Sequence, residues 1–468
     1  MPNLFSGINM AFRAIMSHQQ AIETIQHNVA NVNTPGYHRQ EVVLQASAPT
    51  SNSYGLEHGM GAAQSGTGVE VDRIRRVTLE FFDTRYRFET SRQKRWDLES
   101  EILKQVEYTL AETSTDGLTK KLDQFWTGWQ ALSADPSNYS LRTNVRDLSV
   151  ALTDAFNTRS VRLDMLRTDQ DLTIRQRVDE INTIAEQLAT LNGEISRVKS
   201  MNDQPNDYMD QRDLLLDRLA EIAGARAHYQ DDGSVMVNIS GYSIVTGNSF
   251  NAVETVTNAE GLLDIRWTTD GSKFNPADGE LTGLFEARDV FIPQQKAGLD
   301  LLATELMSRI NTVHQAGFGT NGATNVAFFE GTNAATIKVS SAIQSDLANI
   351  AASSVNGAAG DGENARLLFN VYQEEIMNGG TTTFNAYYNG QVTNFGIQVQ
   401  RAVANAKDRK IVADALANQR ESVSGVSLDE EAANLVKAQR AYQAATRLMN
   451  AFDEMLDRII NQTGMVGR

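Results

Sequence analysis

The chain has 468 residues, a formal net charge of −16 and no cysteine. This length is enough for roughly two or three domains with a sizeable buried core. The acidity argues against a nucleic-acid partner, because phosphate binding depends on lysine and arginine. The absence of cysteine excludes disulfides, thiolate catalysis and zinc–sulfur sites.

No segment predicts membrane insertion or Sec-type export. The opening MPNLFSGINMAFR has its first positive side chain at Arg13, and polar residues interrupt every stretch that could form the apolar core of a signal peptide. No window approaches the run of about 18 apolar residues that a spanning helix needs. We expect a chain that is soluble when made.

The first thirty residues predict an amphipathic helix. Apolar residues alternate spacings of four and three, which is the repeat of a coiled-coil seam. The seam residues are Leu4, Ile8, Ala11, Ile15, Ile22, Ile25 and Val29, with His18 at one further seam position. We interpret His18 as a polar residue that sets register or tilts toward solvent, rather than as a pH sensor.

A turn ends this helix. Pro35 moves Thr34 out of the helical region, and Gly36 supplies the positive φ that a type II turn needs at its third position. Residues 41–46 then predict a short, imperfectly amphipathic extended segment, and residues 69–77 a strand or a connector.

The interior alternates between helical and β-like segments. Short runs punctuated by glycine are typical of a small β domain at residues 225–283, with strands at 234–239 and 262–268. Residues 317–362 look loop-like, with one strand at 336–340. Helical periodicity predicts helices at residues 78–112, 117–133, 138–200, 207–223, 284–316, 363–377 and 383–422, and leaves open whether the long 138–200 helix is continuous or interrupted.

The last forty residues predict a second seam. Ser427 and Glu430 fit a capping box, and three acids in the first turn suit the positive end of the helix dipole without any catalytic role. The seam residues are Leu435, Ala438, Tyr442, Ala445, Met449, Phe452, Leu456 and Ile459. Because both terminal seams have the same spacing and similar length, we expect the two helices to lie side by side.

The sequence therefore predicts a mainly α fold with an inserted β-rich domain (α+β). We expect an elongated molecule with a coiled-coil-like pair of terminal helices, a helical bundle, and the small β domain at the far end. The predicted domains are residues 1–36 with 425–468 (terminal coiled coil), 37–224 with 363–424 (helical core), and 225–362 (inserted domain, β-rich with one long helix).

We find no pattern that predicts catalysis, a metal site or a cofactor. No two of the six histidines are spaced three or four residues apart, so a zinc site on one helix lacks its usual ligands. There is no Walker-type phosphate loop, and the glycine-rich segment 360–365 does not follow a buried strand.

Two terminal motifs resemble a known group of proteins. The segment ANVNTPGY carries Ala30, Asn31, Thr34, Pro35, Gly36 and Tyr37, and resembles the A-N-x-x-T-P-G-Y signature of bacterial flagellar rod, hook and hook-associated proteins. Residues 424–435 and 439–444 resemble most closely the FlgK family within this group, as do the segments 210–213 and 283–289. The stretch between Phe329 and Glu363 is short where larger members carry an outer domain, so we expect that domain to be absent.

The resemblance implies a structural adaptor, not an enzyme, that joins the flagellar hook to the filament. It implies export by the flagellar type III pathway, self-assembly into a tubular ring, and a location outside the cell at the hook–filament junction. The implied partners are the hook protein on one side, a second junction protein and the filament on the other, and an export chaperone at the C-terminal helix. The two seams would form the assembly interface.

Other interpretations stay open. The seams could be ordinary intramolecular core, as most helical stripes are. Within the same group the chain could be a hook or distal-rod subunit. A third possibility is an enzyme or surface-binding protein that uses the central β domain and carries the helices as a stalk.

Overall fold

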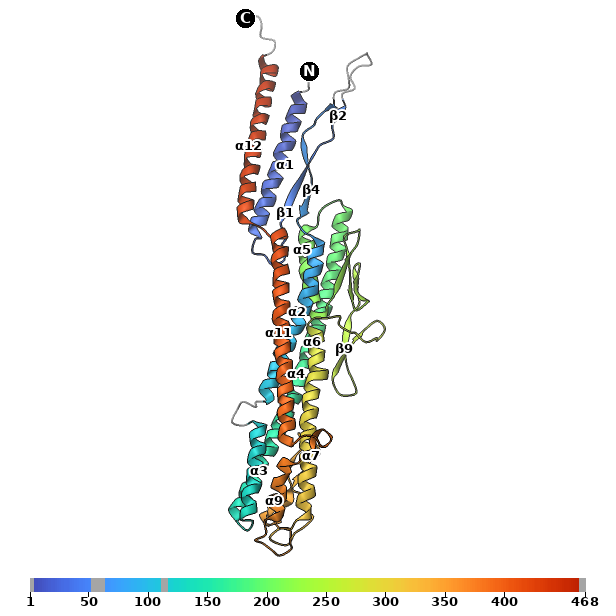
Figure 1. The fold of residues 1–468 in the computed structure, drawn as a ribbon. Helices are drawn as coiled ribbons and strands as arrows, with labels where there is room; N and C mark the ends of the chain where they lie inside the picture. Colours follow the sequence, from blue (N-terminus) through green and yellow to red (C-terminus); the bar gives the residue numbers. More distant parts are fainter. Residues whose placement is uncertain (1–3, 52–63, 111–116, 463–468) are drawn as a thin grey trace.

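The computed structural model describes residues 4–51, 64–110 and 117–462, and it confirms a mainly helical fold with several small sheets. The molecule is a long shaft, with the first and last helices side by side at one end (Figure 1). Among the described residues, no helix is both long enough and apolar enough to cross a bilayer.

The terminal end consists of two helices and a hairpin. Helix α1 packs against both α12 and the antiparallel pair β1–β4, whose register has a bulge after Val43. The sequence analysis anticipated the extended segments, but not that they pair with each other. The bounds are α1 (Leu4–Ala30), β1 (Gln40–Ala46), β2 (Thr50–Ser51), β3 (Gln64–Ser65), β4 (Val69–Arg76) and α12 (Leu428–Asp457), followed by a π turn (Arg458–Gln462).

Long helices form the shaft. Helix α4 runs without interruption for 62 residues, and the side chain of its N-cap residue Asn138 accepts hydrogen bonds from two backbone amides of the first turn. A π turn (Ala287–Phe291) precedes Pro293, which has no N–H for the regular helical pattern. The shaft helices are α2 (Glu80–Leu110), α4 (Tyr139–Ser200), α5 (Asn206–Ala223), α6 (Glu280–Glu286), α7 (Ile292–Ala316) and α11 (Phe384–Ser424).

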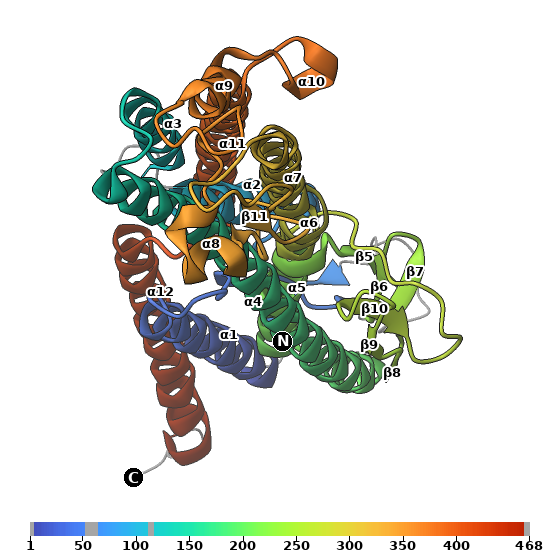
Figure 2. The same cartoon turned by 90° about the horizontal axis from the view of Figure 1, so that it is seen from below.

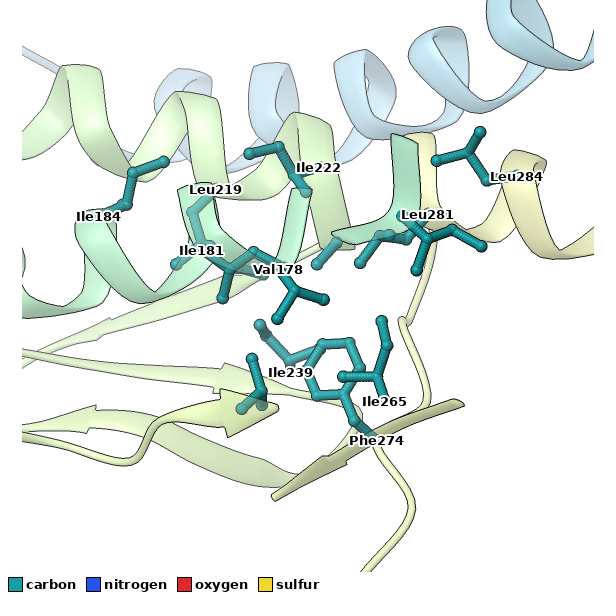
Figure 3. Close-up of a cluster of buried hydrophobic side chains, with 14 of the residues drawn as sticks. Val178, Ile181, Ile184, Leu219, Ile222, Ile239, Ile265, Phe274, Leu281 and Leu284 are labelled. Carbon is teal, nitrogen blue, oxygen red and sulfur yellow. The ribbon is translucent and has the colours of Figure 1, made fainter. Parts of the chain in front are cut away.

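The sheets formed by residues 226–267 do not lie at the far end, where the sequence analysis expected the β domain, but along the flank of the shaft (Figures 1 and 2). Inward residues of the strands, such as Ile239 and Ile265, cover the apolar side of α4 and α5 around Val178 and Leu219 (Figure 3). One sheet has the antiparallel order β5-β6-β7-β8, and β9 pairs with β10. The strands are β5 (Arg226–Tyr229), β6 (Val235–Ile239), β7 (Tyr242–Thr246), β8 (Ser249–Phe250), β9 (Val253–Thr257) and β10 (Leu263–Trp267).

Short helices and loops fill the far end around a second core. Trp129 and Phe328 pack there with residues of α3, α4, α7 and α9. The segment 326–352 therefore packs on shaft helices rather than on the flanking sheets, while the division into three sequence domains remains a prediction. The far-end elements are α3 (Leu118–Ala134), β11 (Phe329–Glu330), β12 (Lys338–Val339), α8 (Ser341–Ser345), α9 (Glu363–Asn370) and α10 (Met377–Gly380), with 3₁₀ turns at Leu347–Asn349 and Val371–Gln373.

His314 is a buried neutral side chain in this second core. Its Nδ1 lies 2.7 Å from the carbonyl oxygen of Val326, and its Nε2 accepts a hydrogen bond from the amide of Ala351 at 2.9 Å. Both contacts are satisfied by the neutral imidazole with the proton on Nδ1. Burial lowers the pKa of His314 to about 4.

We expect His314 to make stability depend on pH. Below the ordinary histidine pKa of about 6.5 the unfolded chain binds a proton that the folded chain does not, so stability falls as pH drops from about 6.5 to 4. The loss is about 1.4 kcal/mol per pH unit and about 3 kcal/mol in total. Urea unfolding followed by tryptophan fluorescence gives the free energy of unfolding at each pH. The difference from the non-ionisable variant His314→Gln measures the contribution of His314.

The comparison with the variant is needed because Glu99 titrates in the same range with the opposite sign. Burial and the neighbouring Glu286 raise the pKa of Glu99 to about 7, so its protonation favours the folded state as pH falls. A difference between His314→Gln and the parent chain that does not change with pH contradicts the assignment.

Candidate assembly surface and its joint to the shaft

A glycine of α1 lies directly against an aromatic ring of α12. A Cβ atom built on Gly7 would lie 2.5 Å from the ring of Phe452, which is far inside van der Waals contact. A side chain at position 7 would therefore displace the tip of the Phe452 ring, and glycine leaves room for it. The sequence analysis counted Phe452 but missed Gly7, because a search for apolar periodicity gives no weight to the absence of a side chain.

Helices α1 and α12 lie against each other, but few of the predicted seam residues are fully covered. Three alanines are buried, namely Ala11, Ala438 and Ala445. Val29 and Ile459 are exposed, and the side chain of Leu4 lies outside what the structure describes. The remaining seam residues are half-buried: Ile8, His18, Ile15, Ile22, Ile25, Leu435, Tyr442, Met449, Phe452 and Leu456.

Both terminal helices carry further apolar side chains that point to solvent. On α1, Phe5, Phe12 and Met16 follow the spacing of seven and four residues that places them on one face. On α12, Leu448 and Met455 are exposed near the end of the helix. Since these residues lie beside the seam, the two helices together present apolar surface that the described residues do not cover. The sequence analysis missed them because it took the seam as the only apolar face.

The family-like turn ends α1 and starts the hairpin. Gly36 has φ of +77°, and a side chain there would also press on Leu214 of α5. The hydroxyl of Thr34 donates a hydrogen bond to the side-chain oxygen of Asn31, and the backbone amide of Asn31 donates one to the carbonyl of His27. Of the motif residues, Ala30 closes α1, and Pro35 is exposed in the turn.

Asn28 joins three elements with one buried side chain. Its Oδ1 accepts hydrogen bonds from the Tyr37 hydroxyl at 2.8 Å and from the Gln40 amide at 2.9 Å. Its Nδ2 donates to the Gln40 carbonyl and to the carboxylate of Glu431 on α12. Burial, with nearby carboxylates, raises the pKa of Tyr37, so its hydroxyl stays a donor. The end of α1 is thereby fixed to β1 and to the start of α12.

Glu431 is more than a first-turn acid that suits a helix dipole. It is almost fully buried, and its Oε1 accepts a hydrogen bond from Nε of Arg39 at 2.8 Å. Glu430 pairs with the same guanidinium at 3.1 Å, so its side chain serves Arg39, while the hydroxyl of Ser427 caps the helix alone. The sequence analysis explained Glu430 and Glu431 by the helix dipole and capping alone. In the structure both carboxylates also bind Arg39, the residue before β1, and so connect the hairpin to α12.

The hairpin is joined to the shaft by ion pairs on α5, which together with Asn28 and Glu431 we term the joint. Asp210 contacts Nδ1 of His38 at 2.7 Å and Nε of Arg76 at 2.8 Å. Asp213 accepts a hydrogen bond from Arg76 at 2.5 Å. Arg87 links Asp213 to Asp217, which also accepts from Arg420 of α11.

Asp213 stays ionised at the centre of this joint. Burial alone would raise its pKa, but the guanidiniums of Arg76, Arg87 and Arg212 outweigh burial and lower it. Three positive groups thus depend on one buried carboxylate. The sequence segment 210–213 was noticed only through a resemblance, because charge spacing on one helix does not show which distant arginines it meets.

We expect Asp213→Asn to destabilise the chain by about 3–5 kcal/mol, because it removes the buried carboxylate that Arg76, Arg87 and Arg212 share and leaves their charges only partly compensated. The melting temperature measured by circular dichroism should fall clearly. Asp203→Asn, which removes an exposed carboxylate from the loop before α5, serves as the matched control and should leave it nearly unchanged. Equal melting temperatures for the two variants would show that the joint adds no stability.

Within the described part of the chain no group of three metal-ligating side chains gathers in one place. What the arrangement offers is a rigid support for an apolar surface. The chemistry of the site is therefore that of packing and ion pairing.

Three family models match the chain. "Flagellar hook-associated protein FlgK helical domain" matches residues 103–329. "Flagella basal body rod protein" matches residues 8–38, which hold α1 and its turn, and "Flagellar basal body rod FlgEFG protein C-terminal" matches residues 417–462, which hold α12.

Curated relatives resemble the chain over its whole length. A flagellar hook-associated protein 1 from Bacillus subtilis strain 168 is 32% identical over 514 aligned residues, covering 100% of both chains. One from Escherichia coli K12 is 26% identical and covers 97% of this chain and 99% of that protein. The structure of the flagellar hook junction protein FlgK from Burkholderia pseudomallei superposes with a TM-score of 0.64 at 15% identity, covering 73% of this chain and all of that one, which shows a shared fold.

Proposed function

Because the chain belongs to the FlgK family of flagellar hook-associated proteins, we propose that it is a structural subunit that joins the flagellar hook to the filament. The family membership rests on similarity across the full length of both chains. It makes the protein a structural component of the flagellum, and the proposal concerns its place and its contacts there.

The uncovered apolar surface of the terminal helices carries the proposal. Phe12 is 52% exposed and Phe5 68% exposed, which is unusual for phenylalanines that lie on one helix face. A subunit that assembles with copies of itself and with related subunits would cover this surface in the tube. Since a tube needs contacts that repeat from one subunit to the next, the interface would be heterologous.

The matches at the two ends support the same conclusion. The rod-type models match the regions of the paired terminal helices and the turn, whereas the FlgK helical-domain model matches the shaft. This division favours an axial subunit whose ends follow a pattern shared with rod proteins and whose shaft is particular to FlgK. The alternative of a hook or distal-rod subunit explains the ends but not the shaft.

The proposal includes specific partners. The hook protein would contact one side of the ring, and a second junction protein with the filament would contact the other. The apolar end of α12 would be a site for an export chaperone before assembly. We place the assembled ring outside the cell, and we assign it no catalytic activity.

We expect Phe12→Asp to prevent filament attachment while leaving the thermal melt of the purified chain within about 0.5 kcal/mol of the parent, because Phe12 is exposed in the monomer. The matched control is Gln19→Asp, an exposed position on α1 that is already polar. Leu435→Asp, at the half-buried seam, should block attachment too. Filaments that attach normally to cells carrying Phe12→Asp would contradict the role of this surface.

The function itself is tested by deletion. We expect cells that lack the chain to build hooks without filaments and to release filament protein into the medium, as electron microscopy and analysis of the medium would show. Normal filaments on such cells would overturn the proposed function.

A further inference from the structure

Two exposed stripes on the shaft have matching spacing and opposite charge. On α2, Phe81, Arg85 and Phe88 lie on one face at intervals of four and three residues; we call this set the α2 stripe. On α4, Met165, Asp169 and Leu172 repeat these intervals; we call them the α4 stripe. Each stripe places one charged side chain between two large apolar ones.

Neither stripe is covered by any part of the chain that the structure describes. Phe81 is 66% exposed and Met165 is 60% exposed, and the other apolar members are also exposed. Arg85 and Asp169 have no ion-pair partner among the residues that the structure describes. Aromatic residues and arginine on a surface are the composition of protein interfaces, and apolar stripes of this kind are rarely left open on a protein that works alone.

The surroundings of the α2 stripe strengthen its positive character. The guanidiniums of Arg92 and Arg226 lie 5.3 Å and 6.0 Å from the centre of the Phe88 ring. Around the α4 stripe, Asp154 and Asp179 continue the same exposed face, which also carries Arg162 seven residues before Asp169, and Arg175 lies toward its edge. Asp169 is the carboxylate that lies between the two apolar residues.

The stripes cannot meet within one molecule. Seen along the shaft, α2 lies beside α11, and α4 lies on the side away from α11 (Figure 2). Inside the chain α2 runs down the shaft and α4 runs up it (Figure 1). Two copies with parallel axes would therefore present the stripes to each other as antiparallel helices. In that arrangement Arg85 faces Asp169, Phe81 faces Leu172 and Phe88 faces Met165.

We propose that the α2 stripe of one copy packs against the α4 stripe of the neighbouring copy in the assembled tube. This inference rests on the proposed function for the existence of the tube, but the contact is separate from that of the terminal helices. It is heterologous, because the two surfaces differ, and so it repeats from copy to copy instead of closing a two-fold dimer.

The contact also fixes a stagger between neighbours. Arg159 on α4 donates to the carbonyl of Leu110 on α2, which places these two residues at the same height. Arg85 precedes Leu110 by 25 residues, and Asp169 follows Arg159 by 10. At about 1.5 Å per residue the neighbouring shafts are displaced by about 22 Å along their length. A tubular ring built by this contact is therefore helical rather than flat.

Engineered disulfides test the contact, because the chain has no cysteine of its own. A chain with both Phe88→Cys and Met165→Cys should form disulfide-linked ladders in isolated flagella. The matched control combines Phe88→Cys with Gln187→Cys, an exposed position on α4 that lies about 33 Å further along the helix. We expect at least about a tenfold higher yield of linked copies for the first pair, and equal yields overturn the proposal.

Charge exchange gives an independent measure. Arg85→Glu and Asp169→Arg should each reduce the number of attached filaments, and the double variant should restore it. Arg85→Glu with Asp154→Arg, an acid on the same face of α4 about 22 Å away, should not. Failure of the correct pair to restore attachment where the single variants impair it counts against the contact.

The two proposals fail in different ways. If isolated flagella contain the chain but the cysteine pair gives only the control yield, the lateral contact is wrong and the proposed function stands. If isolated flagella lack the chain, the proposed function is wrong. The same cysteine pair in the concentrated purified chain then decides whether copies pack through these stripes.

Discussion

The orientation of the terminal helices depends on one buried carboxylate. Asp213 on α5 meets Arg76 from the hairpin and Arg87 from the shaft, and its neighbour Asp210 meets His38 directly after the turn. Only two short links of backbone otherwise connect the terminal helices and hairpin to the shaft, before α2 and before α12. The ion pairs, with the hydrogen bonds that Asn206 donates to Gln40 and Ile74, hold the hairpin against α5. The joint thus fixes the direction of the apolar surface on α1 and α12 relative to the shaft.

Periodicity predicted the long elements well. The heptad-like spacing of Ile8, Ala11 and Ile15 placed α1, and similar spacing placed α12, because a helix that buries one face must repeat that face along the sequence. The capping residue Ser427 located the start of α12 within the sequence. The extended length of α4 was also predictable, since proline and closely spaced glycines are absent from it. The residues proposed from these seams as an interface between copies stay a prediction.

The remaining features depend on contacts between residues far apart in the sequence. The partner of β1 lies beyond a long connection, so local alternation could not name β4. The position of the sheets followed from the apolar side of α4 and α5, which a linear pattern cannot orient. The role of Gly7 depends on a ring 445 positions later, and that of Glu431 on Arg39. Sequence spacing identifies which face of an element is buried, whereas the identity of what covers it comes from tertiary packing.

The continuity of α4 has a mechanical meaning. At about 1.5 Å per residue its 62 residues span about 93 Å. One unbroken backbone therefore reaches from the far end to the level of the joint. A rotating appendage transmits torque through its subunits, and a rod without a break resists bending where two shorter helices would flex at their connection. In a flagellar subunit this continuous helix would limit local bending of the shaft under torsional load.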